Sequence, residues 1–338
     1  MKFKGVTLNA RTAVYLCLAV AFLIPLGMDP DGYLLRIVSM VVLFAAMAQA
    51  WNIVGGLANQ LSLGHAAFFG LGAYTSTLLF IRQGISPWAG MLAGGVVAAV
   101  AMLLLSIPLF RLRGHYFALA TLAFAEVLKI IAIHFADLTE GPTGITIPYG
   151  EPSFANFQFE SNTSYYVVIV ALFAVVSLIF WKLSTGAMGF RLRAIRENEQ
   201  AAEVSGIDTY RIKLGTSMVS AFTMGMCGTV YAQFTYFFDP ESIFSMTGIS
   251  VRVALICIIG GMGRLWGPLI GACILIPLDE IAVNTMSDVA GLGPFVTSVI
   301  LIAAIIYEPR GLISAWERLR RRAQKKHAAQ SGQAAGAV

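Results

Sequence analysis

Residues 164–183 read SYYVVIVALFAVVSLIFWKL, with Lys182 as the single charged side chain. A helix needs about 20 consecutive apolar residues to cross the hydrocarbon core of a bilayer. The same character extends over the chain of 338 residues, of which 57% are apolar and only 12% are charged. Soluble domains carry about 25% charged residues, so this chain has too little polar surface for a water-soluble fold. The sequence predicts an all-α, polytopic integral membrane protein.

Windows of this length and hydropathy predict about ten transmembrane helices. Their ranges are 11–27, 33–54, 61–81, 87–109, 114–136, 164–183, 212–235, 244–261, 266–284 and 292–307. The first is expected to be retained, because no small-x-small cleavage site of a signal peptide follows it. Glycines interrupt the region 236–285, so one of its spans could instead be re-entrant.

The distribution of basic residues predicts the orientation. With ten spans and an internal N-terminus, 19 of the 23 Lys and Arg residues fall in cytoplasmic segments, as the positive-inside rule requires. The longest external loop, 137–163, carries four acidic residues and no Lys or Arg. We therefore expect both termini to be cytoplasmic. The tail at 317–338 begins as a basic segment and is expected to be disordered after about residue 327.

Composition and motifs exclude several classes of protein. The four cysteines lie in apolar stretches without CxxC or metal-ligand spacing, so no metal or cofactor is predicted. The net charge of +5 is concentrated in short loops and the tail, so we expect no nucleic-acid partner. No phosphate-binding GxxxxGK[ST] motif, HExxH, GxSxG or paired-carboxylate arrangement occurs, so no catalytic residue is predicted. Energy for uphill transport would come from another subunit or from an ion gradient.

The segment 184–213, STGAMGFRLRAIRENEQAAEVSGIDTYRIK, is the most informative hydrophilic stretch. Its apolar residues recur at three- to four-residue spacing and predict one short amphipathic helix. These residues are Ala194, Ile195, Ala201, Ala202 and Val204. Gly206 is expected to end the helix, and Asp208 to cap the next span. Its mixed charge favours docking to a soluble partner over lying on lipid headgroups, where cations predominate.

Several motifs carry a resemblance to a known family. Gln200-Ala201-Ala202 followed by Gly206 resembles the EAA-x-x-x-G coupling loop of ABC importer permeases, with Gln200 in place of the usual Glu. Six motifs in order resemble the M-type permease subunit of branched-chain amino-acid ABC importers. They are LSLGHAAFFGLGAY (61–74), RLRGHYFALATLAFAEV (111–127), GPTGI (141–145), RAIRENEQAAEVSGI (193–207), GGMGRLWGPLIGA (260–272) and EPRGL (308–312). Glu140 departs from the family, which commonly has Gly at this position.

The resemblance implies a non-enzymatic transport subunit in the plasma (inner) membrane of a bacterium. It would import leucine, isoleucine and valine together with a homologous H-type permease, two ATP-binding cassette subunits and an extracytoplasmic substrate-binding protein. Residues 1–316 would form one permease domain, with the coupling loop at 184–211. The ATPase-coupling residues would be Arg193, Arg196, Glu197, Glu199, Gln200, Ala201, Ala202 and Gly206.

Polar residues within the predicted spans are candidates for the substrate path, because they are costly in the membrane. Asn59, Gln60, Ser62 and His65 lie in a glycine-flanked stretch where a broken helix could expose backbone groups. Alternatively, His65 is a packing residue hydrogen-bonded to a neighbouring helix.

Glu126 and Lys129 are three residues apart, and therefore neighbours on one helix face. They would form either a substrate or gating site, or a self-neutralised pair that braces the bundle. Arg252 is expected to reach outward toward the Asp239/Glu241 loop, and His115 to mark the inner membrane boundary.

Two other functional classes remain open at this stage. An ion-coupled secondary transporter would use Glu126 as its protonatable site and would need no ATPase. An intramembrane enzyme built around His65 or His115 has little support, since neither has a Cys or carboxylate partner nearby in sequence. Within the ABC alternative, relatives also carry urea, amides or other amino acids, so the motifs do not identify the substrate.

Overall fold

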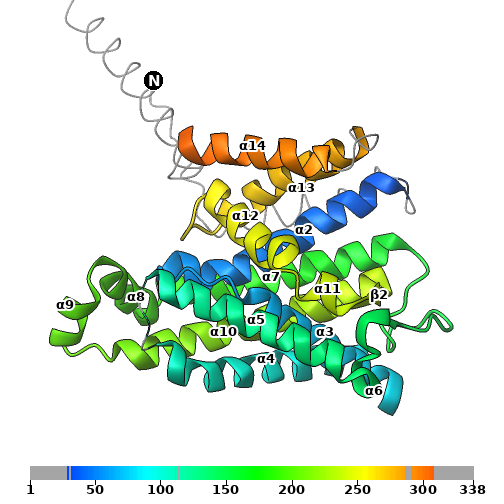
Figure 1. Ribbon diagram of the computed structural model, residues 1–338, viewed down its shortest axis with the longest axis horizontal. Coiled ribbons are helices and arrows are strands. Elements are labelled where there is room, and N and C mark those ends of the chain that lie inside the picture. Colours follow the sequence, from blue (N-terminus) through cyan, green and yellow to red (C-terminus); the bar gives the residue numbers. More distant parts are fainter. Residues whose placement is uncertain (1–28, 30–31, 111, 113, 286–290, 308–338) are drawn as a thin grey trace, which may run out of the picture.

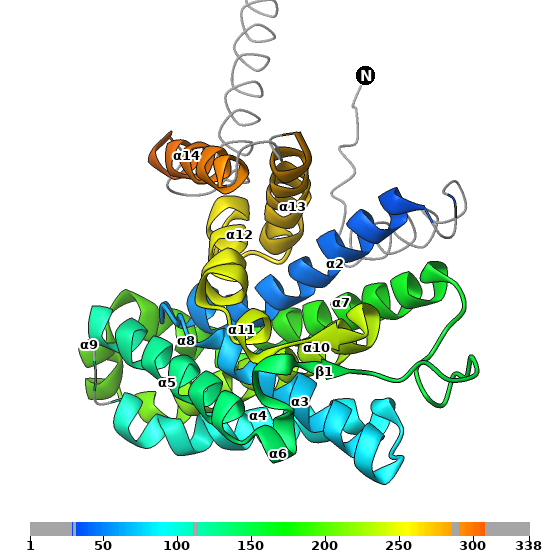
Figure 2. The same cartoon turned by 45° about the vertical axis from the view of Figure 1, so that its right-hand side comes forward.

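Long helices lie side by side in the computed structural model, which describes residues 29, 32–110, 112, 114–285 and 291–307 (Figure 1). The predicted span 11–27 and the predicted tail 317–338 lie outside the described residues. The helices α13 and α14 form a layer beside α12 and away from α4 and α5 (Figures 1 and 2).

The described residues fold into the following elements. The long helices are α2 (Tyr33–Asn52), α3 (His65–Gln83), α4 (Pro87–Leu109), α5 (His115–His134), α7 (Asn162–Thr185), α10 (Thr209–Thr235), α13 (Gly267–Thr285) and α14 (Leu292–Tyr307). The short helices are α6 (Ala136–Thr139), α8 (Ala187–Glu197), α9 (Glu199–Val204), α11 (Pro240–Ile243) and α12 (Arg252–Gly260). Two π-helical turns, η2 (Ile53–Leu57) and η4 (Met246–Val251), one 3₁₀ turn, η3 (Gly141–Thr143), and two strands, β1 (Ile145–Thr146) and β2 (Phe237–Phe238), complete the set.

The all-α membrane architecture predicted from the sequence is confirmed. A helix lies in each predicted span within the described residues, and six segments are long and apolar enough to cross a membrane. These segments are Tyr33–Leu57, Pro87–Leu109, His115–His134, Asn162–Thr185, Pro240–Gly260 and Gly267–Thr285. Three further long helices do not meet these limits of length and hydropathy. The helix α14 has only 16 residues, and α3 and α10 are more polar. A total of ten spans therefore remains a prediction.

The turn between α3 and α4 shows how the sequence sets helix ends. Gly84 follows α3 with a φ of +66°, a left-handed conformation that glycine adopts without steric cost. Its N–H donates to the Phe80 carbonyl at 3.0 Å, and the next N–H donates to Leu79 at 3.2 Å. Pro87 then begins α4, where a missing backbone N–H costs no hydrogen bond.

Glycines allow α3, α4 and α10 to approach at backbone distance. A Cβ on Gly72 of α3 would lie 2.0 Å from the Gly225 carbonyl oxygen of α10. A Cβ on Gly228 of α10 would lie 2.0 Å from the Phe69 carbonyl oxygen, and one on Gly94 of α4 would lie 2.7 Å from that of Gly72. Small residues at crossings of this kind are typical of membrane helix packing, which depends on close van der Waals contact.

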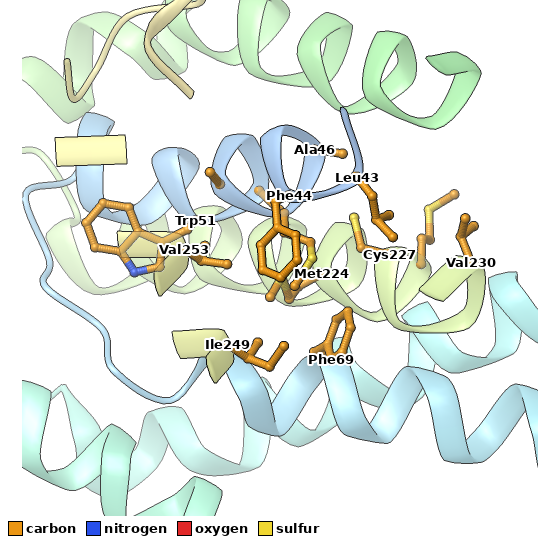
Figure 3. Close-up of a cluster of buried hydrophobic side chains, with 14 of the residues drawn as sticks. Leu43, Phe44, Ala46, Trp51, Phe69, Met224, Cys227, Val230, Ile249 and Val253 are labelled. Atoms are coloured by element: carbon orange, nitrogen blue, oxygen red, sulfur yellow. The ribbon is translucent and has the colours of Figure 1, made fainter. Parts of the chain in front are cut away.

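The hydrophobic core lies where α2 meets α3, α10 and α12 (Figure 3). Phe44 of α2 extends toward Met224 of α10, Leu43 extends toward Cys227 of the same helix, and Phe69 of α3 lies on the opposite side of the cluster (Figure 3). Every residue from Val41 to Ala58 is buried, so α2 and the turn η2 that follows it lie at the centre of the described bundle.

At the end of the bundle that carries the acidic 137–163 loop, a pair of short strands and a pair of tyrosines join neighbouring segments. The strands β1 and β2 pair antiparallel, with Ile145 opposite Phe238. The Tyr165 and Tyr236 hydroxyls share a hydrogen bond, which joins the start of α7 to the end of α10. We call this the acidic end, and the opposite end, with α8 and α9, the basic end.

Candidate coupling and path residues

The segment predicted to be one amphipathic helix forms two helices, so that prediction is wrong in its extent. α8 ends at Glu197, and Asn198 adopts an extended conformation before α9 begins at Glu199. The Asn198 side chain accepts a hydrogen bond from the Ala201 N–H at 3.1 Å. Asparagine is among the strongest N-cap residues, and this signal in the sequence marks the break.

The predicted end of the segment is confirmed. Gly206 has a φ of +84°, and its N–H donates to Glu203 at 2.9 Å, while the Ile207 N–H donates to Ala202 at 3.0 Å. This pair of bonds is the Schellman arrangement that glycine favours. Asp208 then caps α10 by accepting from the Arg211 N–H at 3.0 Å, as predicted.

The two helices bury one face and expose the other. Ile195 and Ala202 are buried against a small cluster that includes Ile53, Leu57 and Phe180. Ala201 is exposed, and Val204 is 90% exposed, although the predicted amphipathic face included both. The break at Asn198 turns α9 relative to α8 and leaves these two apolar side chains exposed.

Each of the two helices is attached to a different long helix. Arg196 of α8 donates from Nη1 to the Gly56 carbonyl at 3.0 Å, in the π-helical turn η2 that ends α2. Glu199 of α9 forms an ion pair with Lys213 of α10. Glu203 accepts from the Thr209 hydroxyl at 2.7 Å, also at the start of α10. Movement of α8 and α9 would therefore act directly on α2 and α10.

A second set of contacts joins η2 to the loop after α12. The fully buried Asn52 accepts from the Gly263 N–H at 2.7 Å and donates to the Arg264 carbonyl at 3.0 Å. A Cβ on Gly56 would lie 2.5 Å from the Gly263 nitrogen, so η2 and the loop after α12 touch through their backbones. π-Helical turns are frequent at functional sites, and this one receives both Arg196 and the 261–266 loop.

Asn59 and Gln60 lie at the basic end beside the α8–α9 segment. They line a cavity of about 390 Å³ together with His115 of α5, Arg196, Glu197, Glu199 and Lys213. Asn59 has a φ of +54°, a left-handed conformation in which asparagine is tolerated. The structure thus brings two predicted path residues together with three predicted coupling residues.

Ser62 and His65 lie inside the bundle. His65 is buried, with Nδ1 3.0 Å from the Ser62 hydroxyl and Nε2 2.9 Å from the Ser220 hydroxyl of α10. The Ser220 hydroxyl in turn donates to the Ala50 carbonyl of α2 at 2.7 Å. This chain of contacts matches the alternative in which His65 packs α3 against its neighbours.

Glu126 and Lys129 form an ion pair on α5, with a distance of 2.7 Å between Oε2 and Nζ. Glu241 of α11 lies 3.7 Å from the same ammonium group. The predicted orientation of Arg252 is wrong. Its guanidinium pairs with Asp279 of α13 at 2.8 Å and lies over the Phe44 ring at 5.5 Å, because α13 packs beside α12.

The remaining predicted coupling residues lie on the exposed surface of the α8–α9 segment. Arg193 stacks over the Phe190 ring at 4.6 Å and donates to the Gly189 carbonyl at 3.1 Å, while Gln200 is exposed. Sequence reasoning missed Asn52, Asn198 and Lys213, of which only the N-cap asparagine had a recognisable local signal. In the part of the chain that the structure describes, no group of His, Cys, Asp and Glu could hold a metal ion.

Comparisons with known proteins cover most of the chain. The family model described as "Branched-chain amino acid transport system / permease component" matches residues 33–306. The chain is 31% identical over 299 residues to the high-affinity branched-chain amino acid transport system permease protein LivM of Escherichia coli, and likewise to that of Salmonella typhimurium, covering 82% of this chain and 69% of each relative. It is 22% identical over 284 residues to the permease protein LivH of Escherichia coli, covering 80% of this chain and 91% of that relative. No solved structure matches.

Proposed function

This chain belongs to the family of branched-chain amino acid transport system permease components, and on that premise we propose that it imports leucine, isoleucine and valine as one subunit of an ATP-driven transporter. It is a multi-pass inner-membrane protein, and the likeness to both LivM and LivH indicates that such permeases work as a pair. Its role is transport without covalent chemistry. Because the sequence has no phosphate-binding loop, ATP hydrolysis falls to two separate ATP-binding cassette subunits, and a binding protein outside the membrane delivers the substrate.

The attachment of α8 and α9 to two long helices supports a coupling role for this segment. On this proposal the ATPase subunit docks on the exposed face of α9, around Gln200, Ala201 and Val204. ATP-driven closure of the ATPases would then move α8 and α9. Arg196 would transmit this movement to η2, and the Glu199–Lys213 ion pair would transmit it to α10. Arg193 and Glu197 lie on the same exposed surface, and Gly206 fixes the turn into α10.

We place the substrate path along the polar residues beside α5. Asn59 and Gln60 would line its basic end, where their cavity opens beside the α8–α9 segment. Glu126 and Lys129 would lie farther along the path, toward the acidic end. Ser62 and His65 would hold the start of α3 in position. On this arrangement residues 1–316 form one permease domain with the coupling loop at 184–211, followed by a cytoplasmic tail.

The first experiment is purification of the tagged chain from its native membrane in mild detergent, with its partners identified by mass spectrometry. We expect a homologous permease and ATP-binding cassette subunits. Recovery of the chain alone or as a homodimer would instead favour an ion-coupled transporter, with Glu126 as the protonatable site. In that case uptake would collapse with a protonophore and survive deletion of residues 193–206.

Ala201→Arg tests the docking surface directly. Ala201 is exposed, so a large charged side chain should leave the fold intact but block the docking surface. We expect the ATPase subunits to be lost from the purified complex and uptake of labelled leucine to fall to background. The matched control is Ala155→Arg, an exposed alanine at the acidic end, which should retain the ATPase subunits. Full transport by Ala201→Arg would disprove the coupling role.

The substrate needs its own measurement, because the permease sequence does not determine it. Competition of labelled leucine uptake by unlabelled isoleucine, valine, urea and amides separates the proposed substrates from the alternatives. Strong competition by isoleucine and valine alone is the expected result. Competition by urea or amides would assign the chain to another substrate class with the same ATP-driven mechanism.

A further inference from the structure

The ion pair on α5 lies near the middle of a helix that is long and apolar enough to cross a membrane, and it reaches the surface of the described bundle. Glu126 is roughly 16 Å from the start of α5 and 12 Å from its end at a rise of about 1.5 Å per residue, so it lies near the middle of the span. Its side chain is 36% exposed, and that of Glu241 is 77% exposed. Ionised side chains at such depth are costly when they face lipid.

The charges on this face do not balance. Two carboxylates, Glu126 and Glu241, lie within 4.0 Å of a single ammonium group, that of Lys129, at 2.7 and 3.7 Å. The group therefore carries one excess negative charge. A neighbour that covers this face would stabilise it by supplying a cationic side chain.

The opposite side of α5 packs into the bundle. The buried Thr121 hydroxyl accepts from the Leu63 N–H at 3.0 Å, so the 59–63 stretch lies beside the first half of α5. At the end of this stretch, Asn59, Gln60 and His115 line one cavity. By contrast, α4 has no charged residue, and the large side chains it exposes are all Leu, Val or Ile. The surface of α4 suits lipid, whereas the Glu126 face of α5 does not.

We propose that the Glu126 face of α5 is the surface that packs against a second, homologous permease subunit, and that this subunit presents a cation to the Glu126–Lys129–Glu241 group. The proposal rests on the proposed function, which requires a permease pair. ATPase subunits and a binding protein would meet this chain at its two ends, so only another membrane-embedded protein can cover a residue at the depth of Glu126. Leu119 and Ile130 on this face are 59% and 60% exposed, so the described bundle leaves the face open.

A homologous subunit fits this face better than a second copy of the same chain. Two identical copies that met through this face would bring together two groups that each carry an excess negative charge. Like charges brought together in a low-dielectric environment repel strongly. A homologue can differ at the facing positions and provide the missing cation, and the likeness of this chain to LivH as well as LivM shows that such homologues exist.

Site-specific photocrosslinking in the native membrane tests the surface. A benzophenone amino acid is placed at Leu119 or Ile130, which lie seven residues before and four after Glu126 and so share its helix face. Matched controls on α4 lie at similar depths from the helix ends. Leu92 is 54% exposed against 60% for Ile130, and Leu104 is 65% exposed against 59% for Leu119. Substitution at these exposed positions should leave folding intact.

We expect the two α5 positions to form a covalent adduct with a homologous permease, identified by mass spectrometry, and the two α4 positions to form adducts with lipid alone. Lipid adducts alone at Leu119 and Ile130, a permease adduct at Leu92 or Leu104, or an adduct with a second copy of this chain would each overturn the proposal. Co-purification of the unsubstituted chain separates the two questions. A permease that co-purifies but does not crosslink through α5 leaves the proposed function standing, and the absence of any permease partner overturns both.

Discussion

Glu140 adopts a left-handed conformation that residues other than glycine and asparagine rarely take. Its φ is +58°, in the turn that joins α6 to η3 in the outer loop. The resemblance to the permease family implies glycine at this position. A side chain here costs about 1–2 kcal/mol of strain, and that strain is borne by a loop remote from the α8–α9 segment.

Glu140→Gly should therefore stabilise the protein. Relief of strain outweighs the greater entropy of glycine in the unfolded chain, and we expect a net gain of about 0.5–1 kcal/mol. The gain is measured as a higher midpoint of thermal unfolding in detergent. Glu151→Gly is the control, because Glu151 is exposed and has no positive φ, so the glycine there should be neutral or destabilising. A lower midpoint for Glu140→Gly would show that the turn is not strained.

Local sequence signals correctly predicted the roles of single residues at helix ends. They did not predict contacts between residues far apart in the sequence. Gly206 and Asp208 were placed correctly because a left-handed cap and an N-cap depend only on neighbouring residues. Arg252 was assigned to the wrong partner because its contact with Asp279 depends on how α12 packs against α13. For the same reason, no pattern near Asn52 indicates that it bridges to a loop more than 200 residues away.

At the scale of elements, the sequence located the long helices from their hydropathy. The segment of α8 and α9 was predicted as one helix because the apolar spacing continues across Asn198. The cap that separates the two helices is this single polar residue. The close packing of α3, α4 and α10 was not predicted. Which glycines meet depends on the crossing of helices distant in sequence.

Two glycines of α10 provide a matched test of this packing. A Cβ on Gly228 would lie 2.0 Å from a backbone oxygen of α3, whereas the nearest atom to a Cβ on Gly215 is the flexible Met188 Cε at 3.5 Å. Gly228→Ala should lower stability by about 1–3 kcal/mol, because the helices must separate. Gly215→Ala should raise stability by up to about 1 kcal/mol through helix propensity. Thermal unfolding of both variants checks the prediction, and equal midpoints would contradict it.

At the scale of the whole molecule, the charge distribution assigns one end to each side of the membrane. The basic end carries α8, α9 and the Asn59–Gln60 stretch, and the acidic end carries β1, β2 and the 137–163 loop (Figure 1). The structure gathers these segments at two opposite ends, as the predicted alternation of spans requires. The side on which each end lies follows from the positive-inside rule.

Cysteine labelling tests this orientation. Ala155→Cys at the acidic end should react with a membrane-impermeant maleimide in intact cells, since residue 155 is exposed. Arg211→Cys at the start of α10 is also exposed but should react only after the membrane is permeabilised. The unsubstituted chain measures the background from native cysteines. Labelling of Arg211→Cys in intact cells would reverse the assignment and remove the basis for docking a cytoplasmic ATPase on α9.

The backbone contacts among α3, α4 and α10 limit how the protein can change shape. At Gly72, Gly94 and Gly228 the backbones of these helices touch, so a rotation that brought a side chain into one of these contacts would force the helices apart. We therefore expect the three helices to move as one rigid body. α5 and the layer of α13 and α14 are outside this block. Alternating access would then be a hinge motion of whole blocks about their boundaries, with the core of each block unchanged throughout the cycle.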